Sequence, residues 1–91
     1  ICRLWQKKGV TIIDPKSTWI EWDCQIGQDT VIYPGSFIQK RTVIGQNCAI
    51  GPNCHLSEAK IQDGVTLESV VIKGRTVGQG EQIVPFSYLS K

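Results

Sequence analysis

The sequence predicts an all-β protein, a parallel β-helix of six-residue repeats, and three observations support this fold class. Aliphatic residues stand at every sixth position through the middle of the chain. A small or β-branched residue stands two positions before most of them. Asp, Asn or Gly, which suit sharp changes of chain direction, usually stand one residue earlier still. Each repeat is therefore expected to be a short strand followed by a tight corner.

The aliphatic series, here called the inner ladder, defines the inward face of the predicted strands. Because six is an even number, every member lies on the same side of an alternating strand, and neither the α-helical period nor a heptad fits. After Leu56 the steps are five or six residues. The strict series is Ile20, Ile26, Ile32, Ile38, Ile44, Ile50 and Leu56, and it continues with Ile61, Leu67, Ile72, Val77, Ile83 and Leu89.

The corner residues complete the repeat. The residue two positions before each ladder member should also point inward, and these residues are Cys24, Thr30, Ser36, Thr42, Cys48 and Cys54. The residue before each of these must turn the chain, and most are types that accept left-handed backbone angles. They are Asp23, Asp29, Gly35, Asn47, Asn53, Gly64 and Gly80, with Arg41 as the exception.

Three corners close one triangular coil, so residues 18 apart are expected to stack and to pair as parallel strands. The 78 residues from Asp14 to Lys91, divided by 18, give about four coils. At roughly 4.8 Å between paired strands, the prism should be about 20 Å tall. The spacing alone does not determine the handedness of the coil.

Composition excludes several classes of function. Ten Lys and Arg are nearly balanced by eight Asp and Glu, and they are scattered, which argues against a nucleic-acid-binding surface. No apolar run is long enough to span a membrane, and no signal peptide is recognisable, so a cytoplasmic location is expected. The chain has no Met, so we expect it to be a fragment or an excised domain.

Four repeats place Gly directly after the ladder residue, as in Ile26-Gly27, Ile44-Gly45, Ile50-Gly51 and Val77-Gly78. This pattern resembles the hexapeptide-repeat acyltransferase superfamily. The resemblance covers most of the chain and implies a left-handed prism that assembles as a homotrimer.

A narrower resemblance rests on several segments taken in order. They look like the start of the acetyltransferase domain in the bacterial bifunctional family that combines glucosamine-1-phosphate acetyltransferase with N-acetylglucosamine-1-phosphate uridyltransferase. That family makes the cell-wall precursor UDP-N-acetylglucosamine, with acetyl-CoA and magnesium as cofactors of the full-length enzyme. The segments are 9–15 (GVTIIDP), 29–34 (DTVIYP), 42–45 (TVIG), 50–53 (IGPN), 63–71 (DGVTLESVV) and Pro85-Phe86.

The resemblance also implies a domain division, with residues 1–9 ending a linker helix and residues 10–91 forming a partial β-helix domain. Ile1, Leu4 and Trp5 share one helical face, and Gly9 can cap the helix. Two helical turns would be marginal alone.

The family's catalytic residues mostly fall outside this chain. An Arg follows the family's Pro-Phe-x-x-Leu segment, but here Pro85-Phe86-Ser87-Tyr88-Leu89 leads to Ser90. Losing Arg removes a phosphate-binding cation. No residue of this chain is therefore predicted to be catalytic, or to bind a cofactor, metal or sugar phosphate.

Two groups of residues have side chains capable of metal binding, catalysis or anion binding, and each group also has a simpler structural interpretation. Cys48, Cys54 and His55 are zinc-ligand types, but their spacing matches no common zinc site, and we expect reduced, buried cysteines. His55 could be a general base, yet its sequence context differs from the family's catalytic histidine, and we expect it to pack on the outside. Lys40-Arg41 and Lys73-Gly74-Arg75 could meet coenzyme A phosphates, although solvated corners are the expected interpretation.

Outward positions carry two columns at 18-residue spacing. The aromatic column is Trp19, Phe37 and His55, and the aliphatic column is Val31 and Ala49. Stacked apolar residues on a surface indicate a partner. We predict that one column faces a neighbouring subunit about a threefold axis; contact with the linker helix or with another domain is the alternative.

Two functional hypotheses follow. The chain could be the trimerising segment of the bifunctional enzyme, inactive as an isolated piece. Alternatively, it could be a free-standing, non-catalytic hexapeptide-repeat module for assembly or binding, which the substitution at Ser90 would permit.

Overall fold

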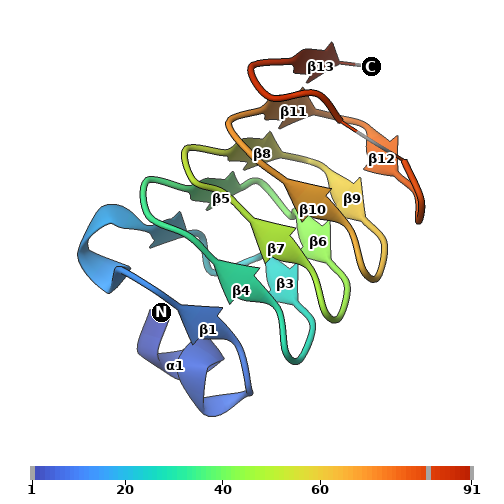
Figure 1. Ribbon diagram of the computed structural model, residues 1–91. Helices are drawn as coiled ribbons and strands as arrows, with labels where there is room; N and C mark the ends of the chain where they lie inside the picture. The colour runs from blue at the N-terminus through green and yellow to red at the C-terminus, as the bar shows by residue number, and fades with distance from the viewer. Residues whose placement is uncertain (1, 82, 91) are drawn as a thin grey trace.

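The six-residue period folds into short parallel strands that wind around a triangular prism (Figure 1). The computed structural model describes residues 2–81 and 83–90, without the side chains of Cys2, Arg3 and Ser90. Gln82 and Lys91 therefore lie outside the description, as does Ile1, which was expected on the helical face. The hexapeptide pattern fits the left-handed form of the β-helix.

Three sheets form the walls of the described prism. Sheet A contains β1 (Thr11–Ile12), β4 (Val31–Ile32), β7 (Ala49–Ile50) and β10 (Thr66–Leu67). Sheet B contains β2 (Trp19–Ile20), β5 (Phe37–Gln39), β8 (His55–Ser57), β11 (Val71–Lys73) and β13 (Tyr88–Ser90). Sheet C contains β3 (Gln25–Ile26), β6 (Val43–Ile44), β9 (Lys60–Ile61) and β12 (Thr76–Val77). The turns between them are named the A–B, B–C and C–A corners.

The inner ladder forms the core, as predicted. Its members from Ile20 to Leu56 are all 7% exposed or less, and the ladder stays buried through Val77. Ile83 and Leu89 are partly buried against it. The predicted inward corner residues are buried too. Burying two side chains from most repeats gives this small chain one continuous core.

Inward hydroxyl groups link one coil to the next. Thr30 Oγ1 donates to the Gly45 carbonyl at 2.7 Å and accepts from the Cys48 N–H at 3.2 Å. These bonds satisfy backbone groups at a corner that no strand pairing reaches. A buried backbone group without a partner would cost about 1–3 kcal/mol, which accounts for Thr30 and for Thr42, whose hydroxyl accepts from the Ala59 N–H at 3.4 Å. The buried Ser36 hydroxyl has no hydrogen-bond partner among the described residues.

Most corner residues adopt the predicted left-handed angles, and two corners differ from expectation. Arg41 (φ 61°) and Lys40 (φ 53°) both lie in the left-handed region despite their residue types. The Glu21 carboxylate accepts from the Lys40 N–H at 2.8 Å and helps to hold this corner. Asp23 instead has no positive φ, because its turn closes through the Cys24 N–H donating to the Glu21 carbonyl.

Coil length varies along the axis. Trp19 pairs with Phe37, 18 residues away, as predicted. Higher in the prism Val43 pairs with Lys60, and His55 with Val71, so the steps shorten to 17 and 16 residues. The corners absorb these differences, and the inner ladder keeps its register.

The helix α1 (Cys2–Lys7) lies across the first coil, and the 3-10 turn η1 (Pro15–Ser17) occupies its A–B corner (Figure 1). Trp5 joins the core and is 9% exposed, whereas Leu4 is 52% exposed, so the predicted apolar face is only partly buried. The short helix turns Leu4 away from the coil. Gly9 has φ +92°, consistent with its predicted capping role. Within the described residues, no helix is long and apolar enough to cross a membrane.

Candidate functional site

The predicted aromatic column exists on the outer side of sheet B. Trp19 pairs with Phe37, and Phe37 pairs with His55. The Phe37 and His55 rings have centroids 4.7 Å apart and planes tilted by 30°. Strand pairing extends the column to Val71 and Tyr88. The result is a line of large side chains along the described height of sheet B.

The predicted aliphatic column lies on the outer side of sheet A. Val31 pairs with Ala49, and both are half-buried between neighbouring coils. Strand pairing adds Thr11 below and Thr66 above. All four side chains are small or β-branched, so this side of the prism is shallower than the aromatic column.

Sequence reasoning missed Val71, Tyr88, Thr11 and Thr66. A strict spacing of 18 misses them because the end coils have other lengths. A signal was nevertheless present for three of them: Thr66, Val71 and Tyr88 directly precede the ladder members Leu67, Ile72 and Leu89. Counting from the ladder, rather than from a fixed period, would have found them.

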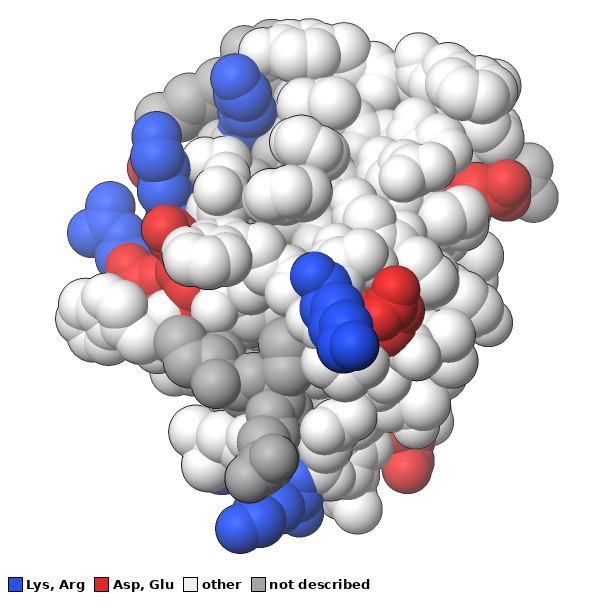
Figure 2. Space-filling model, turned by 90° about the vertical axis from the view of Figure 1, so that its left-hand side faces the viewer, with Lys and Arg blue, Asp and Glu red and all other residues white. Residues whose placement is uncertain are grey.

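The two columns flank one corner of the prism. Sheets A and B meet at the A–B corner, where the second and third coils present Pro34-Gly35 and Pro52-Asn53. Figure 2 faces this side: its upper centre is mostly uncharged, while a blue and a red side chain lie side by side near the middle and others lie along the left edge. Charged residues do occur near its ends, namely Asp14, Lys16 and Glu68.

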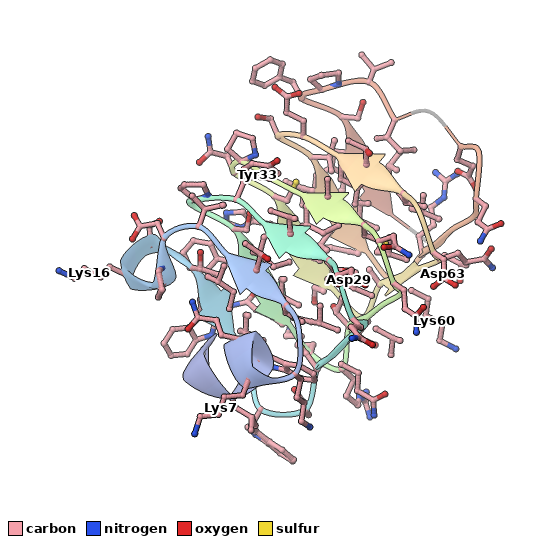
Figure 3. The ribbon with its side chains drawn as sticks, turned by 60° about the horizontal axis from the view of Figure 1, so that its bottom comes forward. Lys7, Lys16, Asp29, Tyr33, Lys60 and Asp63 are labelled. Atoms are coloured by element: carbon pink, nitrogen blue, oxygen red, sulfur yellow. The ribbon has the colours of Figure 1, made fainter. Side chains whose placement is uncertain are left out.

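Charge gathers instead at the other two corners. The B–C corner carries Glu21, Asp23, Lys40, Arg41, Glu58 and Arg75, with Lys73 beside it at the end of β11. The C–A corner carries Asp29, Asp63 and Glu81. Figure 3 shows Asp29, Lys60 and Asp63 on the opposite side of the prism from Tyr33 and Lys16. The uncharged stretch around the A–B corner is thus a local feature of this molecule.

The basic corner segments are exposed and partly paired with acids. Arg41 lies 4.0 Å from Glu58, with both side chains more than half exposed. Arg75 lies 3.5 Å from Glu81. Such exposed pairs contribute little to stability. Each acid also competes with any anion at its Arg, which favours the interpretation as solvated corners.

The Cys48, Cys54 and His55 side chains do not converge. Cys48 Sγ lies 3.1 Å from the Gln62 carbonyl, Cys54 is fully buried, and His55 points outward. Among the described residues, no three His, Cys, Asp or Glu side chains are close enough to hold a metal ion.

The three described inner cysteines are free thiols. Burial raises the pKa of Cys24 and Cys54, because the charged thiolate loses its hydration inside the prism. Both thiols are therefore held in the neutral form, which is the less reactive one.

A shallow groove of about 440 Å³ lies at the lower end of the aromatic column. Its lining includes Pro15, Trp19 and Trp22, and Trp22 is 84% exposed. The groove lies within the first coil and continues the apolar surface of sheet B there.

Comparison with known proteins first defines the class. Residues 23–58 match the family described as "Bacterial transferase hexapeptide (six repeats)". Together with the three-walled prism and its inner ladder, this match makes the chain a hexapeptide-repeat β-helix.

The particular relatives are proteins named "Bifunctional protein GlmU". The chain is 43% identical to that of Clostridium kluyveri and 42% identical to that of Bifidobacterium longum, in each case over 98% of its length. It is 44% identical to that of Mycolicibacterium smegmatis over 92% of its length. The chain spans about a fifth of the length of these relatives. The resemblance inferred from the repeat pattern and from the ordered segments between Gly9 and Phe86 is therefore confirmed.

Proposed function

We propose that this chain is the trimerising β-helix segment of a bifunctional sugar-nucleotide enzyme of the cytoplasm. That enzyme would combine acetyl-CoA-dependent acetylation of glucosamine 1-phosphate with uridylyl transfer. The observation that carries the proposal is the similarity to GlmU proteins over nearly the entire chain.

The role assigned to this segment is that of a scaffold beneath an acetyl-transfer site. The described residues do not fit a site for magnesium, since their metal-ligand types do not cluster. In the two basic corner segments, Arg41 and Arg75 each lie beside a Glu, which would compete with coenzyme A phosphates for the guanidinium groups. His55 stacks on Phe37, which suits packing better than proton transfer. We therefore propose that the isolated chain has no turnover.

The test of this proposal has two arms. Thiol release from acetyl-CoA in the presence of glucosamine 1-phosphate should not exceed a blank without the sugar phosphate. Sedimentation velocity at high micromolar concentration should give a species of about three times the 10.1 kDa chain mass. Appreciable turnover would contradict the scaffold role, and sedimentation only as a monomer would contradict trimerisation.

One sequence observation favours a second candidate, a free-standing hexapeptide module for assembly or binding. Ser90 stands where the resembled family has Arg, although its side chain is not described here. The parent gene distinguishes the two candidates. A nucleotidyltransferase sequence upstream, with the family's acetyltransferase motifs downstream, supports the enzyme; a stop codon soon after Lys91 supports the module.

A further inference from the structure

The two columns differ in size but flank the same corner. The aromatic column presents large side chains, with Trp19 55% and Phe37 37% exposed. The aliphatic column presents Val31 and Ala49, which are half-buried and shallow. The aromatic column projects, the aliphatic column beside it is shallow, and both repeat at the spacing of the coils. The aromatic column of one chain can therefore fit against the aliphatic column of a second copy.

We propose that the aromatic column of one subunit packs against the aliphatic column of the next, with the A–B corner directed toward the threefold axis. This inference rests on the trimer of the proposed function and assigns its interface. Both columns then form one heterologous contact, in which different patches of identical chains meet. Such a contact closes into a ring when the rotation between subunits allows it.

The charge distribution supports a second copy as the occupant of this surface. The A–B corner of the middle coils carries no charged residue, whereas the B–C and C–A corners carry several. Sheet C presents Val43 outward as well, but Lys60 lies directly above it. A second prism also repeats at the spacing of the coils by construction, so it matches the columns along their height.

The shape of the prism explains why the columns should differ in size. Three triangular corners around a shared axis fill only part of the full turn, so neighbouring walls diverge and leave a wedge between them. Large side chains on one wall can fill that wedge while small ones on the facing wall let them approach. Two facing aromatic columns would instead place His55 against its own copy and leave the aliphatic column uncovered.

The same arrangement assigns which residues meet. Rotation about an axis parallel to the prism leaves every residue near its original height. Strands β7 and β8 follow one another in the same coil. His55 of one subunit is therefore expected to face the region of Ala49 on the next.

The experiment uses two single substitutions and their combination in the 91-residue chain. His55→Glu places a carboxylate against an apolar surface, and Ala49→Lys places an ammonium group there. Each alone should weaken assembly at least about tenfold, because a charge buried at an interface without a partner is costly. In the double variant every interface brings the two new charges together, so sedimentation should return toward the trimer.

Val43→Glu on sheet C is the matched control, since Val43 is 40% exposed and points outward from another wall. It should leave sedimentation unchanged. Circular dichroism on each variant checks that the prism is folded, which is expected because both positions are on the outer side.

The outcomes separate this inference from the proposed function. A monomeric wild-type chain overturns the trimer itself. A trimer that neither single substitution weakens overturns the assignment of the interface while the trimer stands. Weakening by both single substitutions without rescue by the double variant overturns the pairing of the two columns. Weakening with rescue, and an unaffected Val43→Glu control, supports it.

Discussion

At the residue scale, Gly27 shows how closely the coils approach each other. A Cβ atom added at Gly27 would lie 2.5 Å from the Gly45 carbonyl carbon and 2.6 Å from the Gln46 nitrogen. Both are backbone atoms of the next coil and cannot move independently of it. We predict that Gly27→Ala lowers the free energy of unfolding by about 1–3 kcal/mol, as overpacking usually does. Urea denaturation followed by circular dichroism measures this loss.

Gly78→Ala is the matched control, because Gly78 occupies the same position in its repeat. The nearest atom to an added Cβ there is a Glu81 carboxylate oxygen at 3.5 Å, which belongs to a flexible side chain. We expect its effect to remain within about 0.5 kcal/mol. Equal losses for the two variants would show that close approach of the coils is not the cause.

The buried thiols predict a dependence of stability on pH. Because burial raises the pKa of Cys24 and Cys54 in the folded chain, the native state holds their protons more tightly than the unfolded state does. Their stabilising contribution is complete below the ordinary thiol pKa of about 8.5 and is lost as the pH rises toward the folded values. Urea midpoints at several pH values should therefore decrease in alkaline solution.

The double variant Cys24→Ala/Cys54→Ala separates the thiols from Lys and Tyr, which also titrate in alkaline solution. Its midpoint should be lower at neutral pH, since two core side chains are truncated, but should fall less steeply with pH. A slope identical to that of the wild type would assign the alkaline loss to other groups.

At the element scale, α1 covers the end of the first coil, and one of its side chains, that of Trp5, packs into the core. Trp5 is 9% exposed and belongs to the core, and its carbonyl accepts from the Lys8 and Val10 N–H groups at 3.0 and 3.1 Å. We predict that Trp5→Ala costs about 3–5 kcal/mol, the usual range for a truncated core aromatic. Loss of tryptophan burial should also appear in the fluorescence spectrum.

Trp22→Ala provides the comparison, because Trp22 is 84% exposed. Its removal should change the free energy of unfolding by no more than about 0.5 kcal/mol. If Trp5→Ala were equally mild, α1 would not contribute to the stability of the first coil.

The strands and corners could be predicted from the sequence because the period determines both. An even spacing places each ladder residue inward, whatever the surrounding context. The backbone angles of individual corner residues were harder to predict. Asp23 has no positive φ because a hydrogen-bonded turn closes its corner, whereas Lys40 has a positive φ and its N–H donates to the Glu21 carboxylate. These choices depend on contacts between residues in the folded chain, and residue type alone does not reveal them.

The candidate site was predictable in part for a related reason. Trp19, Phe37 and His55 follow the strict spacing, so their stacking follows from counting. Val71 and Tyr88 depend on the lengths of the later coils, which strand pairing reveals. Both columns flank the least charged corner, and this could be seen only once the positions of all three sheets were known.

At the scale of the whole molecule, assembly should couple to stability. A 91-residue chain buries a limited fraction of its surface, and association stabilises the folded state by mass action. We predict that the melting temperature of the wild-type chain rises with protein concentration over about a hundredfold range. Differential scanning calorimetry at several concentrations measures this rise.

The His55→Glu variant should melt at a lower temperature than the wild type at each concentration, because its weakened assembly stabilises the folded chain less. A wild-type melting temperature that does not change with concentration would argue that folding of the chain does not depend on association.

The unequal coils have a consequence for how this architecture can change. Pairs separated by 20, 18, 17 and 16 residues all keep ladder side chains inside, as Thr11–Val31, Trp19–Phe37, Val43–Lys60 and His55–Val71 show. Length can therefore vary at a corner without reversing any strand, whereas a single residue added within a strand would turn its inward side chains to solvent. Corners are thus the points where evolution can insert a loop, and where a peptide tag could be grafted onto the prism.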